Sequence, residues 1–378
     1  MTEVKINKEN LINLKTNIFA IGSCFSIEIK KYFKKRGIHI LSNPFGTMYN
    51  SYSIYNSLNR IINLKYYNEK EISFYNNKYF SFDHYTKYSS DNITECLNKI
   101  NRDIQISNEY IKKCDFFIIT LGTSIVYLYN NTIVANCHKL PDKNFTKKIL
   151  SAEENITNLK NIVDLLERNF NNPKILVTLS PIRHNKEDLS LNCYSKSILR
   201  VAIESIINSK NIFYFPSFEI VMDQLRDYDY YKEDQIHLKR KTVDYIFDRF
   251  VDNYFTTDAK DYIKKFYEIY KTYKHKPVNK NSGYFSLLEN GLKRLNDLQK
   301  IRDDKIIHNM KLKIIHRIIK YFYSNEILQT LVPYIDEEYK EIFYSFLNSE
   351  EINFKFYSCN NKILTKIART IFLKKKGF

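Results

Sequence analysis

The sequence lacks the features that direct a chain into or across a membrane. Its first residues, MTEVKINKENLINLK, have no charged start followed by an apolar run and a small-residue cleavage site. No later stretch is long and apolar enough to span a bilayer. These absences predict a soluble, cytoplasmic protein without a membrane span.

Paired cysteine motifs are also missing. The 6 cysteines contain no CxxC pair and no regular spacing, which is typical of thiols kept reduced inside a cell and does not indicate a zinc site. We therefore expect neither a disulfide framework nor a bound metal or cofactor. The six are Cys24, Cys96, Cys114, Cys137, Cys193 and Cys359.

Tryptophan is absent, and glycine and proline are held to 7 residues each, whereas lysine, asparagine, isoleucine and tyrosine dominate. The formal net charge of +17 would ordinarily indicate nucleic acid or an anionic membrane as a partner. Here the basic residues are spread along the chain without a nucleic-acid-binding motif. We interpret the charge as a compositional bias that gives a solvated basic surface, and we expect no specific nucleic-acid binding.

The length of 378 residues favours a main domain with a smaller appendage. The pattern changes after about residue 256 to helical segments rich in tyrosine, lysine and leucine, with KHKPVNKNSG (residues 274–283) as the clearest break. We predict a main domain over residues 1–255 and a helical extension over 256–378. Too few heptads are sustained for a coiled coil, so the extension is expected to pack against the main domain. The apolar residues concerned are Leu288, Leu292, Leu295 and Ile301.

Short apolar runs alternate with helical patterns through the main domain. Helices are predicted at about 26–36 and 51–64, and a hairpin at 71–82 around Asn76-Asn77. This alternation predicts an α/β fold with a mostly parallel sheet covered on both faces. Strands are predicted at residues 17–21, 38–41, 115–120, 174–179 and 211–215.

Ligands bind beyond the carboxyl ends of the strands in such sheets, and four of the following loops carry chemically capable residues. They are residues 23–24, 43–46, 122–124 and 180–184. In the first, AIGSCFS (residues 20–26), a small nucleophile stands at a helix N-terminus, where the backbone N–H groups stabilise an anion. Cys24 could attack an acyl carbon as a thiolate. Alternatively, Ser23 caps the helix and Cys24 is an inert buried thiol.

The segment EDQIHLK (residues 233–239) precedes the last helical run of the main domain. His237 is suited to take and return a proton near neutral pH, and Asp234, three residues earlier, could orient its ring. A DxxH pair alone also occurs often at ordinary surfaces.

Several collinear segments resemble the GSCFA-domain family, which belongs to the wider SGNH/GDSL-type group of hydrolases and acyltransferases. The resemblance covers roughly residues 15–250. The matching segments are IGSCFS (21–26), NPFGTMYN (43–50), LGTSIVY (121–127), VANCHKLP (134–141), SPIRH (180–184), YSKSILR (194–200) and FPSFEIVMDQLRDYDYYKEDQIH (215–237).

The resemblance implies a flavodoxin-like three-layer sandwich with a nucleophile after the first strand and a catalytic Asp and His before the last helix. His237 would be the base and Asp234 its partner. The first motif of the wider group reads Gly-Asp-Ser, and a match without gaps places Cys24 at the position of the nucleophile. Ser23 would reach that point only after a one-residue shift of the turn.

The resemblance also implies an oxyanion hole built from the nucleophile's own N–H, a glycine in the second loop and an asparagine in the third. Gly46 matches the second position, whereas Ser124, a shorter donor, stands at the third. Asn136, His138 or Arg183 could replace the missing asparagine.

Several further polar residues have an ordinary structural interpretation. His84 and His184 are expected to be hydrogen-bonded residues, although either could line the substrate pocket. Cys137 and His138 are weak metal ligands, because adjacent residues on an extended chain point to opposite faces. A solvated helix start is the simplest interpretation of the remaining three, Asn192, Ser195 and Lys196.

The function predicted from these residues is acyl-ester hydrolysis or O-acyl transfer through a Cys/Ser-His-Asp triad. The substrate would be an acyl ester or thioester, and water or a sugar hydroxyl would accept the acyl group. The alternative is a non-catalytic module that binds a carbohydrate or a partner protein in the same cleft.

Overall fold

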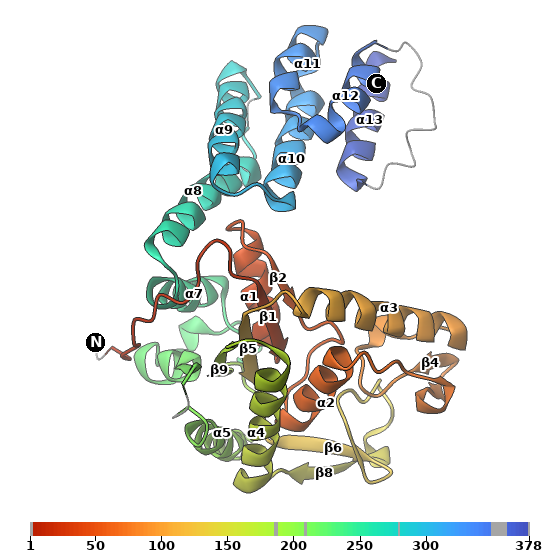
Figure 1. Ribbon diagram of the computed structural model, residues 1–378, viewed down its shortest axis with the longest axis vertical. Helices are drawn as coiled ribbons and strands as arrows, with labels where there is room; N and C mark the ends of the chain where they lie inside the picture. Colours follow the sequence, from red (N-terminus) through yellow and green to blue (C-terminus); the bar gives the residue numbers. More distant parts are fainter. Residues whose placement is uncertain (1–2, 185–187, 208–209, 279, 349–360, 377–378) are drawn as a thin grey trace. The chain divides into compact units, whose positions relative to one another are not determined.

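The computed structural model describes residues 3–184, 188–207, 210–278, 280–348 and 361–376. The chain divides into two compact units. The first comprises Met1–Lys34 and His39–Thr257, and the second comprises Lys35–Ile38 and Asp258–Phe378. Figure 1 shows the elements of both units.

A five-stranded parallel sheet forms the centre of the first unit, in the order β10-β9-β5-β1-β2. The chain moves from β1 to one edge, returns past β1 to β5 and then proceeds to the other edge. This is the flavodoxin-like strand order, and its switch point lies between β1 and β5. All five strands coincide with predicted ones to within two residues. Their bounds are Ile18–Gly22 (β1), Ile40–Ser42 (β2), Phe116–Leu121 (β5), Lys174–Leu179 (β9) and Ile212–Phe215 (β10).

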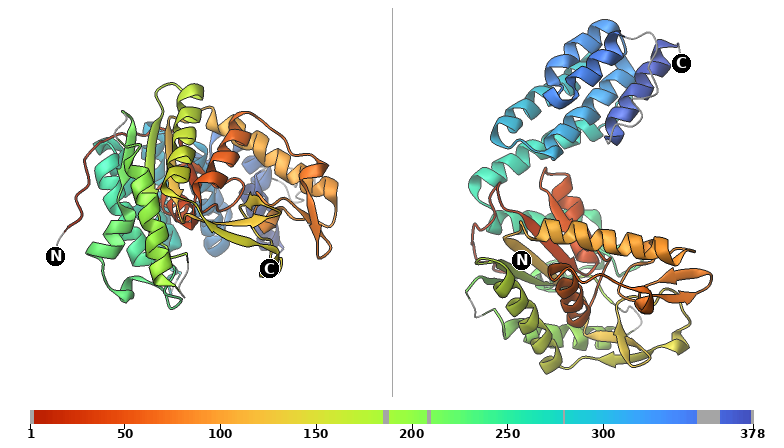
Figure 2. Two further views of the ribbon diagram at one scale, coloured as in Figure 1. Left: turned by 90° about the horizontal axis from the view of Figure 1, so that it is seen from below. Right: turned by 45° about the vertical axis from the view of Figure 1, so that its right-hand side comes forward.

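Helices cover both faces of this sheet and complete three layers (Figure 2). Alternate residues of a strand point to opposite faces. Phe19 and Ile21 of β1 join a hydrophobic core with residues of α2, α3, α4 and α5. On the opposite face α1 packs against α7, where the rings of Phe25 and Phe247 stack 5.0 Å apart. The helices are Cys24–Lys34 (α1), Ser51–Ile62 (α2), Ile93–Ile111 (α3), Ala152–Asn169 (α4), Leu189–Glu204 (α5) and Arg240–Tyr254 (α7).

Two small antiparallel sheets flank the central one. The predicted hairpin pairs β3 (Ser73–Tyr75) with β4 (Lys78–Phe80), and Asn76 and Asn77 both have positive φ, as a tight hairpin turn requires. The second sheet has the order β7-β6-β8 and was not predicted from the sequence. Its strands are Ile125–Tyr129 (β6), Thr132–Val134 (β7) and Thr146–Ile149 (β8). Short helical segments complete the unit: Glu69–Glu71, Thr86–Tyr88, Asp142–Asn144, Ser217–Glu219, Ile220–Gln224 and Tyr228–Tyr230.

The second unit is helical, as predicted, and the break in its pattern separates α8 (Thr257–Lys274) from α9 (Ser282–Ile301). Leu288, Leu292 and Leu295 of α9 are buried, and α9 packs against α10 within the unit. Among the described residues, no helix has the length and apolar character needed to cross a membrane. The remaining helices are Lys305–Phe322 (α10), Asn325–Leu331 (α11), Val332–Tyr334, Glu337–Asn348 (α12) and Lys362–Lys375 (α13).

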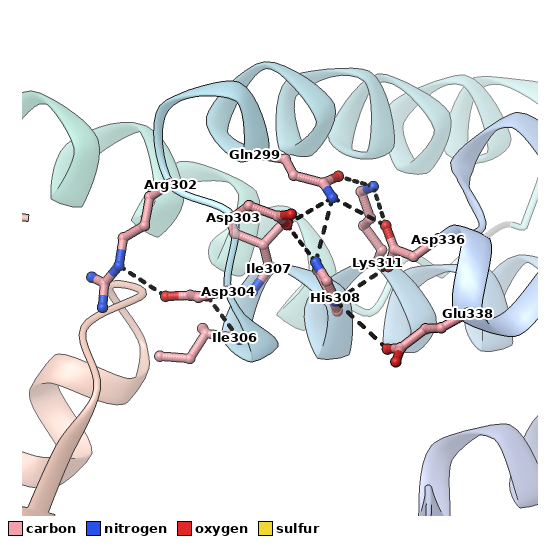
Figure 3. Close-up of polar contacts among 10 residues, drawn as sticks. All are labelled: Gln299, Arg302, Asp303, Asp304, Ile306, Ile307, His308, Lys311, Asp336 and Glu338. Carbon is pink, nitrogen blue, oxygen red and sulfur yellow. Dashed lines mark hydrogen bonds and ion pairs between the residues drawn. The ribbon is translucent and has the colours of Figure 1, made fainter. Parts of the chain in front are cut away.

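A polar network joins α9, α10 and the start of α12 inside the helical unit (Figure 3). His308 Nε2 lies 2.5 Å from Asp303 Oδ1, and Lys311 Nζ lies 2.9 Å from Asp336 Oδ1. Gln299 donates to both Asp303 and Asp336. Lys311 and Asp336 are almost completely buried, with side-chain exposures of 4% and 9%. The network therefore satisfies buried charges within the helix packing.

Candidate active site

A pocket of about 300 Å³ opens at the carboxyl ends of the central strands. Its walls come from the segments that follow β1, β2, β5 and β9 and from the segment that precedes α7. This is the edge of the sheet where an α/β fold of this strand order places ligands. The lining residues are Ser23, Cys24, Tyr49, Gly122, Ser180, Ile182, Arg183, His184, Ile236 and His237.

The turn from β1 into α1 depends on Gly22. Its φ of +131° belongs to a region that residues with a side chain rarely adopt. A Cβ at this position would lie 2.1 Å from the carbonyl oxygen of Thr120 on β5. The absence of a side chain thus allows β1 and β5 to approach closely at the switch point, directly below the pocket.

Ser23 and Cys24 both line the pocket, but their side chains have different surroundings. The Ser23 hydroxyl lies 3.1 Å from Thr120 Oγ1 and accepts a 3.3 Å hydrogen bond from the N–H of Phe25. Ser23 is 2% exposed. Cys24 is half-buried, and its Sγ lies 3.2 Å from the hydroxyl of Tyr49. Ser23 therefore anchors the turn to β5, and Cys24 presents the more accessible nucleophile.

Tyr49 follows β2 in the segment NPFGTMYN and was not singled out from the sequence. Burial is the main effect that raises the pKa of the Tyr49 hydroxyl above its ordinary value, and the neighbouring Cys24 raises it further. The hydroxyl therefore remains protonated and can donate a hydrogen bond to sulfur or to a nearby oxyanion. Its backbone carbonyl accepts hydrogen bonds from the N–H groups of Gly122 (2.7 Å) and Thr123 (2.9 Å), which ties the second loop to the third.

The second loop is held against the nucleophile turn by Asn43. The side chain of this buried residue accepts a 2.8 Å bond from the N–H of Gly22 and donates a 3.0 Å bond to its carbonyl. The backbone carbonyl of Asn43 accepts the N–H of Gly46 at 3.0 Å. Gly46 packs against Tyr85, where an added Cβ would lie 2.4 Å from the Tyr85 Cβ. Gly46, predicted as an oxyanion donor, therefore uses its N–H inside its own loop and does not line the pocket.

The predicted pair of Asp234 and His237 forms on the segment before α7. Asp234 Oδ2 lies 2.7 Å from His237 Nδ1, and Oδ1 accepts the backbone N–H groups of His237 (2.9 Å) and Ile236 (3.0 Å). These bonds, chiefly that from the backbone of His237, lower the pKa of Asp234 to about 2. An ionised Asp234 that accepts at Nδ1 leaves Nε2 as the ring nitrogen available for proton transfer.

The loop after β9 supplies two predicted residues, Arg183 and His184. The Arg183 guanidinium lies over the rings of Tyr228 and Tyr231 at 5.1 and 4.5 Å and donates to the carbonyl of Gln235 at 3.2 Å. The His184 ring packs against Tyr49 at 5.9 Å. Burial, followed by nearby lysines, lowers the pKa of His184, so its ring is favoured as a neutral wall of the pocket.

Lys196 supports this loop from below. Its Nζ donates to the carbonyls of Ser180 (2.6 Å) and Ile182 (3.2 Å), both of which line the pocket. Lys196 is 2% exposed, and burial lowers its pKa to about 7. The interpretation of Asn192, Ser195 and Lys196 as a solvated helix start was wrong, because all three are buried at the start of α5 and bond to the loops beside the pocket.

Ser124, the second predicted oxyanion donor, is fully buried and lies outside the pocket lining. Its hydroxyl bonds to the carbonyl (3.2 Å) and hydroxyl (3.0 Å) of Ser195. The Ser195 hydroxyl also accepts the backbone N–H of Ser124 at 2.8 Å. The third loop is thereby fastened to α5, and Ser124 serves this connection in the structure.

His84, Asn136 and His138 gather away from the pocket. His138 Nε2 lies 2.9 Å from the carbonyl of Ser81, and its ring stacks on Phe80 at 4.2 Å. Asn136 Oδ1 accepts the backbone N–H of His138 at 2.9 Å. His84 is fully buried, and neither of its ring nitrogens has a hydrogen-bond partner among the described residues, so the expectation that it is hydrogen-bonded was wrong. Burial lowers its pKa well below the ordinary value. Within the described part of the chain, no group of three or more His, Cys, Asp or Glu side chains is arranged to hold a metal ion.

The pocket therefore combines a thiol, an imidazole with a carboxylate partner, and a protonated phenol. Cys24 is the first residue of α1, so its own N–H has no acceptor within the helix and is available to an anion. Such a set can attack a carbonyl carbon, move the proton and stabilise the oxygen that becomes negative. Apart from Cys24 itself, the donors differ from those implied by the sequence resemblance.

Comparison with known protein families matches residues 17–250 to the GSCFA family. The match includes every residue of the pocket lining. It covers more than half of the chain, which therefore belongs to the GSCFA family. A search of curated proteins returns no match.

Proposed function

On the premise that this chain is a GSCFA-family protein, we propose that it is an acyl-group enzyme of the SGNH/GDSL type that acts through Cys24, His237 and Asp234. The observation that carries the proposal is that Cys24 and His237, more than 200 residues apart, line one pocket while His237 is bonded to Asp234. A nucleophile, a base and a residue that orients the base are the parts that covalent acyl transfer needs.

In the first half of the reaction, the Cys24 thiol gives its proton to Nε2 of His237, and the sulfur attacks the carbonyl carbon of an ester or thioester. The carbonyl π-electrons move to the oxygen, which accepts hydrogen bonds from the N–H of Cys24 and the hydroxyl of Tyr49. Collapse of this intermediate breaks the bond to the leaving group, which takes the proton from His237. The acyl group remains on Cys24 as a thioester.

In the second half, water or a sugar hydroxyl gives its proton to His237 as its oxygen attacks the thioester. Collapse releases the Cys24 sulfur, which recovers the proton. Water yields a carboxylic acid, and a hydroxyl yields a new ester, so hydrolysis and O-acyl transfer share every protein group. The proposal includes a reducing, cytoplasmic location, because a thiol nucleophile must remain reduced to act.

Cys24 is proposed as the nucleophile in preference to Ser23. The Ser23 hydroxyl is engaged with Thr120 and with the N–H of Phe25, so its attack would require loss of the contacts that anchor the turn. Cys24 needs no such rearrangement, and a thiol is deprotonated by imidazole more readily than a hydroxyl.

The test is to capture the acyl-enzyme. The protein is mixed with p-nitrophenyl acetate, quenched in acid and weighed intact, and the acetylated residue is identified by peptide mapping. We expect acetyl-Cys24, loss of the adduct in Cys24→Ala, and a fall in p-nitrophenol release of at least about 10³-fold. Ser23→Ala should still form acetyl-Cys24.

Cys193→Ala is the matched control, because Cys193 is an exposed thiol outside the pocket lining, and it should leave the adduct on Cys24 unchanged. An adduct that survives Cys24→Ala and disappears in Ser23→Ala would make Ser23 the nucleophile. A folded protein that forms no adduct and releases no p-nitrophenol with any simple ester or thioester would favour the binding module.

A further inference from the structure

A second pocket, of about 420 Å³, lies beside the first and was not predicted from the sequence. The small sheet contributes residues of β6 and β8, and α5 contributes a residue of its first turn. Its aliphatic residues are buried or half-buried and are called the floor, and its two lysines are exposed and are called the rim. The lining residues are Ile125, Tyr127, Lys147, Lys148, Ile149, His184 and Leu191.

The charge of this second pocket is one-sided, because the part of its lining that the structure describes contains two lysines and no aspartate or glutamate. Lys148 is already paired, with its Nζ 2.6 Å from a carboxylate oxygen of Glu154. Lys147 lies over the ring of Tyr127, with Nζ 5.6 Å from the ring centre. The ammonium of Lys147 is therefore the positive group that an incoming anion would meet.

His184 joins the two pockets, since it lines both of them. On one side its ring packs against Tyr49, whose hydroxyl lies 3.2 Å from Cys24 Sγ. The positive charge of Lys147 also acts on the imidazole. It lowers the pKa of His184, after the larger effects of burial and of the charge of Lys196. A ligand that extends from the first pocket into the second beside His184 would thus contact both the Cys24 thiol and the ammonium of Lys147.

We propose that the second pocket is an anion subsite that holds the phosphate-bearing leaving group of an acyl ester or thioester whose carbonyl lies at Cys24. This assignment rests on the proposed acyl chemistry. The aliphatic floor of Ile125, Ile149 and Leu191 accommodates the carbon skeleton of such a group, and Lys147 pairs with its phosphate.

A phosphate-bearing group fits the second pocket better than a plain alkyl chain. An alkyl chain would gain from the aliphatic floor but would not use the unneutralised charge at the rim. A phosphate offers several strong acceptor oxygens to an ammonium, and charge-assisted hydrogen bonds are roughly twice as strong as neutral ones. The same pocket would select against substrates with cationic leaving groups.

Binding is tested first without turnover, on Cys24→Ala, by following the ring resonances of His184 by NMR at constant pH while inorganic pyrophosphate is added. We expect a saturable shift at His184 that is lost or weakened about tenfold in Lys147→Gln. Lys160→Gln is the matched control, because Lys160 is an exposed lysine on α4 outside the pocket lining, and it should leave the titration unchanged. No saturable shift, or equal weakening by both substitutions, overturns the subsite.

Substrate selection is tested next with two thioesters that differ in the leaving group, acetyl-coenzyme A and the neutral S-acetyl-N-acetylcysteamine. We expect kcat/KM to favour the phosphorylated thioester by about tenfold, and Lys147→Gln to remove this preference through KM while turnover of the neutral thioester is unchanged. If both thioesters are cleaved equally well, the subsite fails and the proposed function stands. If pyrophosphate binds at His184 and no thioester or ester is cleaved, the proposed function fails and the anion site stands.

Discussion

The two units each contain a histidine bonded to an aspartate, and the surroundings of the two pairs differ. In the α/β unit, the Asp234 carboxylate is hydrogen-bonded to Nδ1 of His237, and the ring lines a pocket that is also lined by Cys24. In the helical unit, the Asp303 carboxylate is hydrogen-bonded to Nε2 of His308. Nδ1 of His308 lies 3.8 Å from a carboxylate oxygen of Asp336 and 3.9 Å from one of Glu338. One pair has a thiol in its pocket, and the other is surrounded by further carboxylates.

The pocket beside His308 is the larger, at about 630 Å³, and its described lining contains no cysteine, serine, threonine or tyrosine. An imidazole with no hydroxyl or thiol to deprotonate has no partner for nucleophilic catalysis. A His-Asp pair therefore does not identify an active site. What separates the two is the set of side chains that line the pocket beside each ring.

The largest expected effect comes from removing the two imidazoles in turn. His237→Gln should lower ester turnover by about 10³- to 10⁴-fold, because it removes the group that carries the proton in both halves of the proposed reaction. His308→Gln should leave turnover unchanged and destabilise the helical unit by about 1–2 kcal/mol through the lost bond to Asp303. Turnover of p-nitrophenyl acetate and hydrogen exchange of the helical peptides measure the two effects. Similar losses of turnover in both variants would remove the distinction between the pairs.

The next effect concerns the two buried lysines. Lys311 is paired with Asp336, so Lys311→Met leaves a buried carboxylate without its cation and should destabilise the helical unit by about 3–5 kcal/mol. Lys196 donates only to backbone carbonyls, so Lys196→Met should cost about 1–3 kcal/mol in the α/β unit. Hydrogen exchange of peptides from each unit measures both values.

The two lysine variants should also differ in their pH dependence. Burial lowers the pKa of Lys196 to about 7, whereas an unfolded lysine titrates near 10.4. The unfolded state therefore binds more protons between these values, so the free energy of unfolding contributed by this group rises with pH from about 7 to 10 and is lost as pH falls through about 7. Lys196→Met should flatten this rise. An unchanged slope would mean that Lys196 is not the buried titrating group.

The smallest expected effect is on the pKa of the two aspartates, Asp234 and Asp303, which is lowered by a different main cause in each. The backbone N–H of His237 is the main cause for Asp234, whereas the side chain of His308 is the main cause for Asp303. Asp234 should therefore keep a pKa below its ordinary value in His237→Gln, and Asp303 should return toward the ordinary value in His308→Gln. Carboxyl ¹³C NMR titrations measure both.

The sign of the linkage is the same for both aspartates, since each is stabilised in its ionised form. For Asp234 the contribution to stability is present above the ordinary pKa and is lost as pH falls through about 2. A titration in which His237→Gln fully restores the pKa of Asp234 would show that the imidazole, and not the backbone, holds the carboxylate.

The sequence was sufficient for the central sheet because its strands are short, apolar and separated by helical patterns. It was insufficient for β6, β7 and β8. Residues 146–149 read TKKI and are mostly exposed, so this edge segment carries no apolar alternation to indicate a strand. The second pocket depends on these strands and was missed with them.

At the site, the sequence identified the residues with distinctive chemistry, and the structure was needed to show how the other polar groups are used. Gly46 and Ser124 bond within the scaffold, and neither partner could be inferred from local sequence. Tyr49 lies seven positions after β2 and reaches Cys24 only through the course of the loop. Lys196 reads as a surface residue until the fold places carbonyls around it.

The close approach at Gly22 restricts which parts of this turn can vary. Ser23 bonds to Thr120 and belongs to the contacts between the turn and β5. The side chain at position 24 meets Tyr49 in the pocket, so it can be exchanged while these contacts are kept. Position 22 has no such freedom, because even a methyl group would collide with a main-chain oxygen of β5. A library that redesigns the chemistry of this site can therefore randomise position 24, but every functional member must keep the glycine itself.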